Sequence, residues 1–535
     1  MRWKIACASL LVLTACQPAP VAQPTAAPAA APTVAAQPTA APQPTLAPTV
    51  APTLAPTATA QPAQKLTIDL GADLDNLDPY LSYSPEGLSI HHNIFDYLVE
   101  RDAQGKLAPG LAESWSIADP VTLQFNLRKG VKFHNGEDFN ADSVKASAER
   151  MLDQNLNSGV RSRFASIAEV RVVDPYTVQF VLSRPDATLL DSLSNQMAML
   201  PAQVASQAGA SPLTTPVGTG PYRFVEWNRG DHVTLEANTN YWSGSVKGQP
   251  KMKTVVFRPV PTPGTRLADL QSGQADMVAG LTPDQAKQLA AGTHLERTDL
   301  PGYQYIFFND RLADTPLKDA RVRTALNMAV DRASIIQSLL GATVQPLKAA
   351  VGPLTAGYDP SLEGFAYDPA RARQLLTEAG ASNLELTLDV AQPDRSDLID
   401  AVAAQLAQVG VKVTIQTFDT AAFNDRWVAH NMHDLFFVRW ATFADPGTLN
   451  LLASCNSFLS FFCSTAADPL LTQGGSTLDE AARNKAYAQA LKELNDDPFA
   501  LYLTTLSALY GVSDRVSGWK PSASGYLYAT EAQLR

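Results

Sequence analysis

The chain has 535 residues, of which 45% are hydrophobic and 17% charged, and its formal net charge is −11 at pH 7. This acidic balance, without a basic cluster, argues against binding to nucleic acid and against direct binding to anionic lipid. After the N-terminal segment no apolar run reaches the roughly 20 residues of a membrane-spanning helix. The length is too great for one hydrophobic core and suffices for about two or three domains.

The first sixteen residues are typical of an export signal. Positive charges at Arg2 and Lys4 precede an apolar run over residues 5–12, and the sequence LTAC ends at Cys16. LTAC resembles the bacterial lipobox, which implies that Cys16 becomes the first mature residue and carries a lipid. The alternative is an ordinary signal peptide with a chance cysteine.

Residues 17–64 differ in composition from the rest of the chain. They include no charged residue and consist largely of Pro, Ala, Thr, Gln and Val. Such a segment cannot bury enough apolar surface to fold, so we expect a disordered or polyproline-II-like tether. Fully extended, it would reach on the order of 150 Å.

The first part of the folded body alternates short predicted strands with one helix. Residues 65–70 and 122–127 have strand character, whereas residues 90–99 have the apolar spacing of a helix. Asn135-Gly136 is a strong hairpin turn, and residues 170–182 are expected to form a second hairpin.

Residues 216–242 form the most distinctive stretch. The glycines of Gly218-Thr219-Gly220-Pro221 indicate a tight bend, which the alternating strand residues 222–227 follow. Residues 228–231 have turn character, and alternation resumes at Val233. A hairpin is therefore expected here.

The second part of the body alternates helices and strands. We expect one helix over 318–335, whose apolar residues fall on one helix face. Asp368 is the expected N-cap of a helix that ends at Gly380. The remaining elements are a strand at 384–390, a helix at 396–409, a strand at 411–415 and a strand at 435–440. The strands at 384–390 and 411–415 are joined by the helix and are therefore predicted to be parallel.

Several of these strings, in this order, resemble one known family. They are LAESWSIADPVTLQFNLRKGVKFHNGEDFNADSV (111–144), PVGTGPYRFVEWNRGDHVTLEANTNYW (216–242), LADLQSGQADM (267–277), DARVRTALNMAVDR (319–332) and YDPARARQLLTEAG (367–380). Together they are similar to family 5 of the extracytoplasmic solute-binding proteins of ABC transporters. Members of that family carry oligopeptides, dipeptides, nickel chelates and some sugars.

The resemblance implies an α/β, two-lobed periplasmic-binding-protein-like fold with an additional inserted α+β domain. It also implies a hinge of two crossing segments and a ligand cleft between the lobes. The expected divisions are a signal at 1–16, a tether at 17–64, a first lobe at 65–104, 208–298 and 508–535, an inserted domain at 105–207, and a second lobe at 299–507.

No enzyme signature accompanies this pattern. Gly-x-Ser-x-Gly, Walker, His-Glu-x-x-His and paired Cys-x-x-Cys motifs are all missing from the sequence. The resemblance points the same way, so we expect a protein that is not an enzyme and uses no cofactor. The alternative from a different class is a tethered cell-surface hydrolase.

Cys455 and Cys463 are the only cysteines outside the export segment. Because an exported protein meets an oxidising compartment, a disulfide between them is the preferred interpretation. Two buried thiols are the alternative. A metal pair is not favoured, since no second pair of ligands with suitable spacing is present.

Candidate ligand contacts come from the resemblance. It implies that Trp440, at the end of the strand LFFVRW, and its neighbours Arg439 and Ala441 offer groups to an extended ligand. It assigns the same role to Tyr83 and Ser84, which follow the first strand. Core packing for Trp440, and an exposed loop for Tyr83 and Ser84, are the alternatives.

The charges near Trp440 depart from the family pattern. Peptide-binding members often have an aspartate three residues after that Trp, whereas this chain has Phe443. Asp445 follows and is a further candidate contact, although it could belong only to a turn. Losing a charge-assisted bond to the ligand's amine, worth about 1.5–3 kcal/mol, weakens the oligopeptide interpretation. Arg439 could hold a carboxylate instead, or form a structural ion pair.

The histidines do not define a metal site. His91 and His92 are adjacent on a predicted helix, so their side chains point about 100° apart and would not chelate together. His430 and His433 have the spacing His-x-x-His. A metal chelate is therefore a minor alternative.

The sequence thus predicts a lipid-anchored binding protein outside the cytoplasmic membrane. Its expected partners are a small solute, most often a peptide in this family, and the permease of an ABC importer. An oligosaccharide or another small organic solute is the closest alternative. We expect a monomer that contacts the membrane only through its lipid.

Overall fold

The structure is a computed structural model that describes residues 65–392, 396–440, 444–457 and 459–535. The predicted export signal with Cys16, the predicted tether and Ala441 lie outside the described residues. Within the described ranges, no helix is long and apolar enough to cross a membrane.

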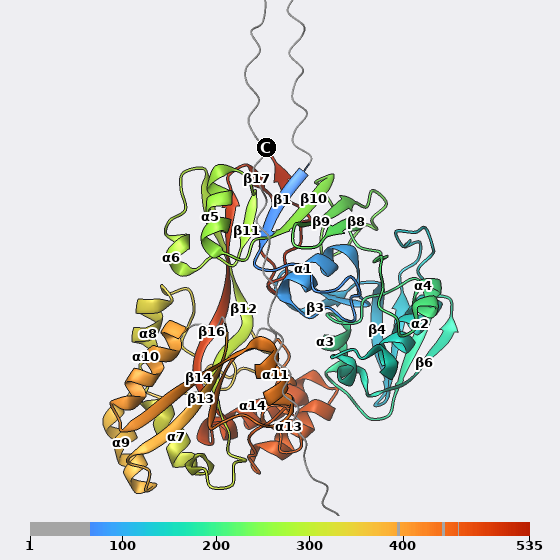
Figure 1. The fold of residues 1–535 in the computed structure, drawn as a ribbon. Helices are drawn as coiled ribbons and strands as arrows, with labels where there is room; N and C mark the ends of the chain where they lie inside the picture. Colours follow the sequence, from blue (N-terminus) through green and yellow to red (C-terminus); the bar gives the residue numbers. More distant parts are fainter. Residues whose placement is uncertain (1–64, 393–395, 441–443, 458) are drawn as a thin grey trace, which may run out of the picture. The chain divides into compact units, whose positions relative to one another are not determined.

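Helices and strands are distributed over the whole described chain (Figure 1). The first elements are β1 (Lys65–Leu70), α1 (Pro85–Ile94), β2 (Val99–Arg101), β3 (Leu107–Pro109), β4 (Ala112–Asp119), β5 (Thr122–Leu127), α2 (Ala141–Leu152), η1 (Gln154–Leu156), η2 (Arg161–Phe164), β6 (Ile167–Asp174), β7 (Thr177–Leu182), α3 (Leu189–Leu193), α4 (Ala202–Ala208), β8 (Tyr222–Asn228), β9 (His232–Ala237), β10 (Thr254–Pro259), α5 (Pro263–Ser272), β11 (Met277–Ala279) and α6 (Pro283–Ala286).

The remaining elements are β12 (Thr293–Phe308), η3 (Pro316–Lys318), α7 (Ala320–Met328), α8 (Arg332–Leu339), α9 (Pro369–Glu378), β13 (Leu384–Gln392), α10 (Ser396–Ala407), β14 (Val411–Asp419), α11 (Thr420–Val428), β15 (Leu435–Trp440), α12 (Thr448–Ala453), α13 (Ala467–Ser476), α14 (Glu480–Asp496), β16 (Ala500–Ser513), β17 (Val516–Ser517) and β18 (Gln533–Leu534).

One ten-stranded sheet organises the fold, with the strand order β14-β13-β15-β12-β16-β11-β1-β10-β9-β8. The long antiparallel strands β12 and β16 run through its middle, and their register shifts between Leu300 and Tyr303. Strands β11, β1, β10, β9 and β8 lie beyond β16 and are called the β1 side below. Strands β15, β13 and β14 lie beyond β12 and are called the β13 side. Two long strands therefore connect the two sides.

A separate antiparallel sheet has the order β4-β5-β7-β6 and is formed by residues between β3 and α3. Its strands alternate: Leu123, Phe125 and Leu127 of β5 are buried between less buried neighbours. Helix α2 presents Val144, Ala148 and other buried residues and contacts β6 and β7. This is an α+β unit within the chain of the larger sheet.

The apolar cores follow the same division. One cluster joins the β1 side, α1 and the four-stranded sheet, and includes Ile68, Phe95 and Phe180. Two other clusters contain the β13 side: one includes Phe308 and the other its neighbour Phe307. Because successive strand residues face opposite ways, these two clusters cover opposite faces of the sheet.

A buried charged cluster ties the stretch 216–242 to the end of α1. Lys247 Nζ lies 3.0 Å from Asp96 Oδ1 and 3.0 Å from Glu100 Oε1, and all three side chains are at most 1% exposed. Asp96 also accepts hydrogen bonds from Thr219 and from the indole of Trp242. Lys247, Asp96 and Glu100 are called the Lys247 cluster below.

The glycines at the start of that stretch have a different purpose from the expected one. Neither has a positive φ. A Cβ on Gly218 would lie 2.1 Å from the carbonyl oxygen of Ile94, and one on Gly220 would lie 2.5 Å from the carbonyl carbon of Ile94. Glycine is therefore needed for close approach to the end of α1.

Two predicted helices have the wrong bounds. The first begins at Pro85, capped by Ser84, and ends at Ile94 because the chain is extended from Phe95 onwards. The apolar residues that follow it are buried but lie in an extended segment. The helix predicted over 318–335 is interrupted, because Asp319 caps α7 and Asp331 caps the separate helix α8.

Other local predictions are confirmed. β8 and β9 form the expected hairpin, and β6 and β7 form the one around Asp174-Pro175. Asp368 caps α9, with Pro369 in its first turn. β13, α10 and β14 form a strand–helix–strand unit whose strands are parallel.

Candidate functional site

A cavity of about 820 Å³ lies where the two sides of the large sheet meet. Its wall includes Leu70 and the first turns of α1 from the β1 side, and Gln304 and Arg439 from the β13 side and its neighbour β12. The two long strands that connect these sides contribute Leu300 of β12 and the middle of β16. Residues next to the four-stranded sheet close another part of the wall. The cavity is thus formed by parts that are distant in sequence.

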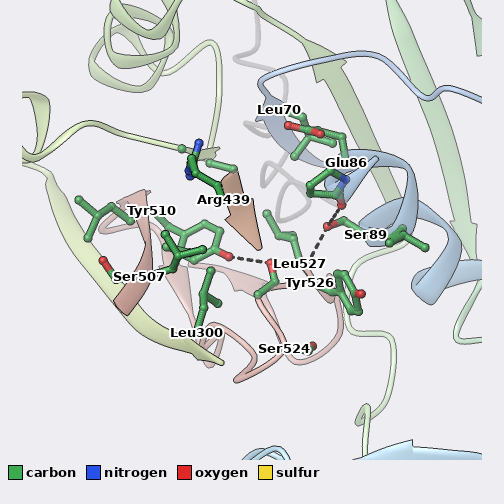
Figure 2. Close-up of a pocket in the computed structure, with 18 of the residues that line it drawn as sticks. Leu70, Glu86, Ser89, Leu300, Arg439, Ser507, Tyr510, Ser524, Tyr526 and Leu527 are labelled. Atoms are coloured by element: carbon green, nitrogen blue, oxygen red, sulfur yellow. Dashed lines mark hydrogen bonds between the residues drawn. The ribbon is translucent and has the colours of Figure 1, made fainter. Parts of the chain in front are cut away.

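Arg439 and Trp440 face opposite sides of β15. Arg439 pairs with Gln304 and Trp440 with Tyr303 across the β12–β15 ladder. Arg439 and Gln304 both line the cavity, and Figure 2 shows Arg439 in its wall. Trp440 is instead half-buried and packs edge-on against Trp427, with ring centroids 6.1 Å apart. Strand alternation therefore gives these neighbours different surroundings.

Tyr83 lines the cavity and also braces its wall. The residue is 44% exposed, and its hydroxyl accepts a hydrogen bond from Gly159 N at 2.6 Å and donates one to Tyr80 O at 2.9 Å. Ser84 is the N-cap of α1 and accepts a hydrogen bond from Gly87 N. Ser84 is not among the residues that line the cavity. The proposed ligand contacts of both residues stay a prediction.

Asp75 fixes the loop that carries Tyr83 and Ser84. Its carboxylate accepts hydrogen bonds from Ser82 Oγ at 2.5 Å, Tyr83 N at 2.8 Å and Ser84 N at 3.1 Å. Burial opposes ionisation of Asp75, but these hydrogen bonds outweigh it and lower its pKa. The carboxylate therefore stays charged and holds the start of α1 at the cavity edge.

Asp78 anchors the same loop to the α+β unit. Its carboxylate forms a bidentate ion pair with Arg150 of α2, and both side chains are at most 1% exposed. It also accepts hydrogen bonds from the backbone of Tyr80 and Leu213, each at 3.0 Å. With all its acceptors engaged, Asp78 has a structural role.

Asp445 forms a salt bridge with Arg483 of α14. Its carboxylate lies 2.5 Å from Arg483 Nη2 and accepts a hydrogen bond from Gly447 N at 2.7 Å. Burial raises the pKa of Asp445, and the Arg483 charge opposes that rise. Asp445 does not line the cavity, so its suggested ligand contact stays a prediction without support from its position.

The C-terminal segment forms a further part of the wall that sequence reasoning missed. Ser524 to Leu527 line the cavity (Figure 2). Tyr526 donates a hydrogen bond to Asn195 Oδ1 at 2.8 Å, and the backbone of Leu527 is bonded to Ser89 and Asn93 of α1. No local pattern marks these residues, because their position depends on contacts with the start of the chain.

The histidines are used in packing. Burial lowers the pKa of His91 to about 4, and its Nε2 bonds to Asn76 O. His92 is stacked between Tyr97 and Tyr526. His433 bonds to Asp389 at 2.6 Å, and His430 stacks on Phe461. Within the described ranges, no group of three or more His, Cys, Asp or Glu residues is placed to hold a metal ion.

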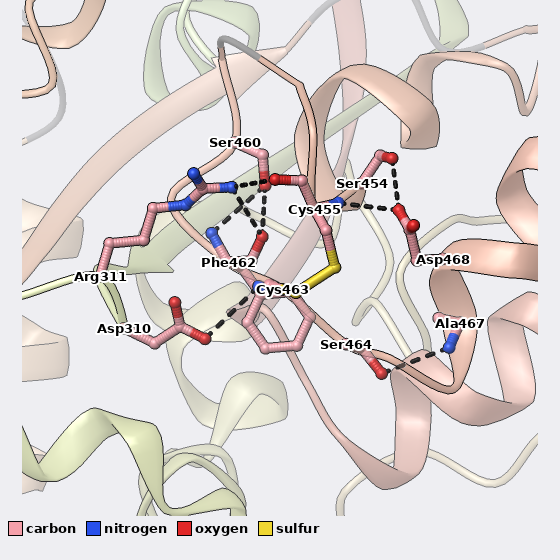
Figure 3. The surroundings of a disulfide bond; sticks show 10 residues. All are labelled: Asp310, Arg311, Ser454, Cys455, Ser460, Phe462, Cys463, Ser464, Ala467 and Asp468. Atoms are coloured by element: carbon pink, nitrogen blue, oxygen red, sulfur yellow. Dashed lines mark hydrogen bonds between the residues drawn. A yellow bond between two sulfur atoms is a disulfide. The ribbon is translucent and has the colours of Figure 1, made fainter.

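Cys455 and Cys463 are joined by a disulfide in the structure (Figure 3). Arg311 donates to Cys455 O at 2.8 Å, and Asp468 accepts from Cys455 N at 2.8 Å. Within the closed loop, Leu459 O accepts a hydrogen bond from the indole of Trp427. The loop therefore supports Trp427, which in turn packs against the end of β15.

Comparison with known proteins identifies relatives. Residues 106–458 match the family described as bacterial extracellular solute-binding proteins, family 5 Middle. A glutathione-binding protein GsiB from Pectobacterium atrosepticum is 30% identical over 476 residues, covering 85% of this chain and 91% of that protein.

Two solved structures have the same fold. The ABC transporter substrate-binding protein CtaP from Listeria monocytogenes matches with a TM-score of 0.80 at 22% identity, covering 89% of this chain and 100% of that one. The periplasmic binding protein DppA from Helicobacter pylori, in complex with the peptide STSA, matches with a TM-score of 0.76 at 24% identity, covering 88% of this chain and 98% of that one.

These matches confirm the predicted fold class, the mixed α/β fold of periplasmic binding proteins. The predicted limits of the lobes and of the inserted domain stay a prediction. A solute-binding family is not a family of enzymes, which agrees with the lack of catalytic motifs in the sequence. The chain belongs to the bacterial extracellular solute-binding proteins of family 5.

Proposed function

We propose that this protein is the lipid-anchored solute-binding component of an ABC importer, and that it captures a peptide or a similar small, extended solute. The cavity of about 820 Å³ between the two sides of the large sheet carries this proposal. Its volume lies within the range of roughly 300–1,000 Å³ that is usual for small-molecule sites.

We expect capture of the solute to involve a movement of the β1 side relative to the β13 side about the long strands β12 and β16. The register of the β12–β16 ladder shifts between Leu300 and Tyr303 and again between Gln304 and Tyr305, and both Leu300 and Gln304 line the cavity. A solute that contacts both walls would bind the closed form more tightly than an open one and so shift the population towards it.

Peptides are favoured over metal chelates as the solute. One relative is a glutathione-binding protein, and one protein of the same fold holds the peptide STSA. No histidine is among the described residues that line the cavity, so imidazole ligation of a metal has no support there.

Thermal melting with a library of short peptides tests this function. We expect a rise in the melting temperature with a binding peptide, which should be recovered intact afterwards. Ser507 lies half-buried in the cavity floor on β16, so Ser507→Trp should fill the cavity and abolish the rise. Ser116→Trp, on the exposed surface of β4, is the matched control and should retain it.

Other outcomes would contradict the proposed function or the proposed site. A melting temperature that no peptide raises would contradict peptide capture, and cleavage of the bound peptide would instead favour a hydrolase. A rise that persists in Ser507→Trp would place the binding site elsewhere.

The lipid anchor is tested separately. Because LTAC ends at Cys16, Cys16→Ser should release the protein from membranes. Cys7→Ser, within the apolar run of the same segment, should leave the protein attached. Membrane retention of the Cys16 variant would refute lipidation at that residue.

A further inference from the structure

The charges of the cavity wall are few and unbalanced. Among the described residues that line the cavity, only Glu86, Arg163 and Arg439 are charged. Glu86 lies in the first turn of α1, Arg163 in η2 and Arg439 near the end of β15. Three separate parts of the chain thus each contribute one charged side chain, and the wall carries one net positive charge.

The Arg163 guanidinium makes no hydrogen bond or salt bridge with any residue in the described ranges. The acidic group that acts on it electrostatically, Asp191, is already in a salt bridge with Arg101. Burial lowers the pKa of Arg163, because the charged form has lost water. A carboxylate would stabilise a guanidinium in this position, because the planar guanidinium can form two parallel hydrogen bonds with the two carboxylate oxygens.

Arg439 is the second such cation. Its neighbours on the same face of the sheet are paired with each other, since Thr504 donates a hydrogen bond to Gln304 Oε1 at 2.9 Å. The Arg439 side chain is exposed towards the cavity and has no hydrogen bond or salt bridge to a described residue. Two arginines from different parts of the chain, η2 and β15, are therefore available to a solute.

Glu86 supplies the single negative charge. It is half-buried, and its carboxylate accepts no hydrogen bond from the described residues. The nearby cation, Arg266, directs its hydrogen bonds to the carbonyl groups of Val260, Pro261 and Gly280. An ammonium group of the solute would fit beside Glu86.

We propose that the solute is an acidic zwitterion with one ammonium and two carboxylates, held by Glu86 on one wall and by Arg163 and Arg439 on the others. This assignment rests on the proposed function, since it uses the same cavity. A short peptide or amino-acid derivative with one additional acidic group has this chemistry. Its net charge of −1 neutralises the wall.

Calorimetric titration of tripeptides that differ in one side chain tests the two arginines. Ala-Ala-Glu, Ala-Ala-Gln and Ala-Ala-Lys have net charges of about −1, 0 and +1. We expect binding to weaken in that order, by roughly tenfold per step, which corresponds to about 1.4 kcal/mol. Arg163→Gln and Arg439→Gln should each reduce the preference for the acidic peptide, and Arg163→Lys should retain part of it.

Arg161→Gln provides the matched control, because Arg161 belongs to the same short helix as Arg163 but does not line the cavity. It should bind all three peptides as the wild type does. Circular dichroism would confirm that each variant is folded.

N-acetylation of Ala-Ala-Glu tests Glu86. Removing the ammonium should weaken binding to the wild type by roughly tenfold and leave binding to Glu86→Gln unchanged, if the two groups contact each other. Equal weakening in both proteins would overturn the role of Glu86.

The outcomes separate this inference from the function on which it rests. Peptides that bind with no dependence on charge, or a charge preference that survives both arginine substitutions, overturn the inference alone. Failure of every peptide in the series to bind the folded wild type overturns the inference together with peptide capture.

Discussion

The Lys247 cluster and the cavity wall both hold charged side chains, but the charges have different surroundings. In the Lys247 cluster each charge has a partner about 3 Å away, and none is more than 1% exposed. In the cavity wall, Arg163 and Arg439 form no salt bridge with a described residue. Paired buried charges hold parts of a fold together, whereas unpaired charges in a cavity are available to a ligand.

Removing a partner from the Lys247 cluster should have the largest effect on stability. Lys247→Met would leave the carboxylates of Asp96 and Glu100 buried without their cation. We expect a loss of about 3–5 kcal/mol in the free energy of unfolding, measured by urea denaturation. A loss below about 1 kcal/mol would show that the Lys247 cluster contributes little to stability and would contradict its contrast with the cavity wall.

The pH dependence of stability should reveal Glu100 next. Burial, opposed by Lys247, raises the pKa of Glu100 from 4.5 to about 7. A raised carboxyl pKa stabilises the fold below pH 4.5, and this contribution is lost as the pH rises to about 7.

Glu100→Gln keeps a neutral side chain at every pH, so it should lack this loss. The wild type should therefore lose up to about 3 kcal/mol relative to Glu100→Gln between pH 4.5 and 8. Denaturation curves of both proteins at several pH values give the comparison. A constant difference would show that folding does not raise the pKa of Glu100.

The disulfide provides a covalent comparison with the charged cluster. Cys455 and Cys463 are separated by eight positions, so the crosslink closes a short loop. Replacing both by Ala should lower the free energy of unfolding by about 2–3 kcal/mol. The thiols of the wild type should also resist alkylation until they are reduced. Rapid labelling of the native, oxidised protein would contradict the bond.

Replacing Arg163 should have the smallest effect on stability. Arg163→Met removes a half-buried cation whose side chain has no hydrogen-bond partner among the described residues, so no hydrogen-bonding group is left unpaired. We expect the ligand-free protein to change by less than about 1 kcal/mol, with any change stabilising. A destabilisation as large as that of Lys247→Met would show that Arg163 is a structural residue and would remove the contrast.

The sequence was informative where the signal is local. The hairpin β8–β9 and helix α9 have turn and cap residues at their ends, and both were predicted. The start of α1 was missed even though Ser84-Pro85 is a recognisable cap and first turn. The apolar spacing of residues 90–99 misled the prediction, because residues after Phe95 are buried in an extended segment.

The site was only partly predictable for a different reason. Tyr83 and Arg439 came from resemblance to a family, and both line the cavity. Sequence reasoning did not single out Glu86 and Arg163. They line the same cavity as Arg439 only because α1, η2 and β15 pack around it in three dimensions. Trp440 was singled out, but alternation along β15 turns it away from Arg439 and towards Trp427.

A crystal structure of the protein with a bound acidic tripeptide would test the central claim most directly. The account predicts density for the intact peptide in the cavity, with its carboxylates within hydrogen-bonding distance of Arg163 and Arg439 and its ammonium beside Glu86. An empty cavity with the peptide bound elsewhere on the folded protein would contradict it.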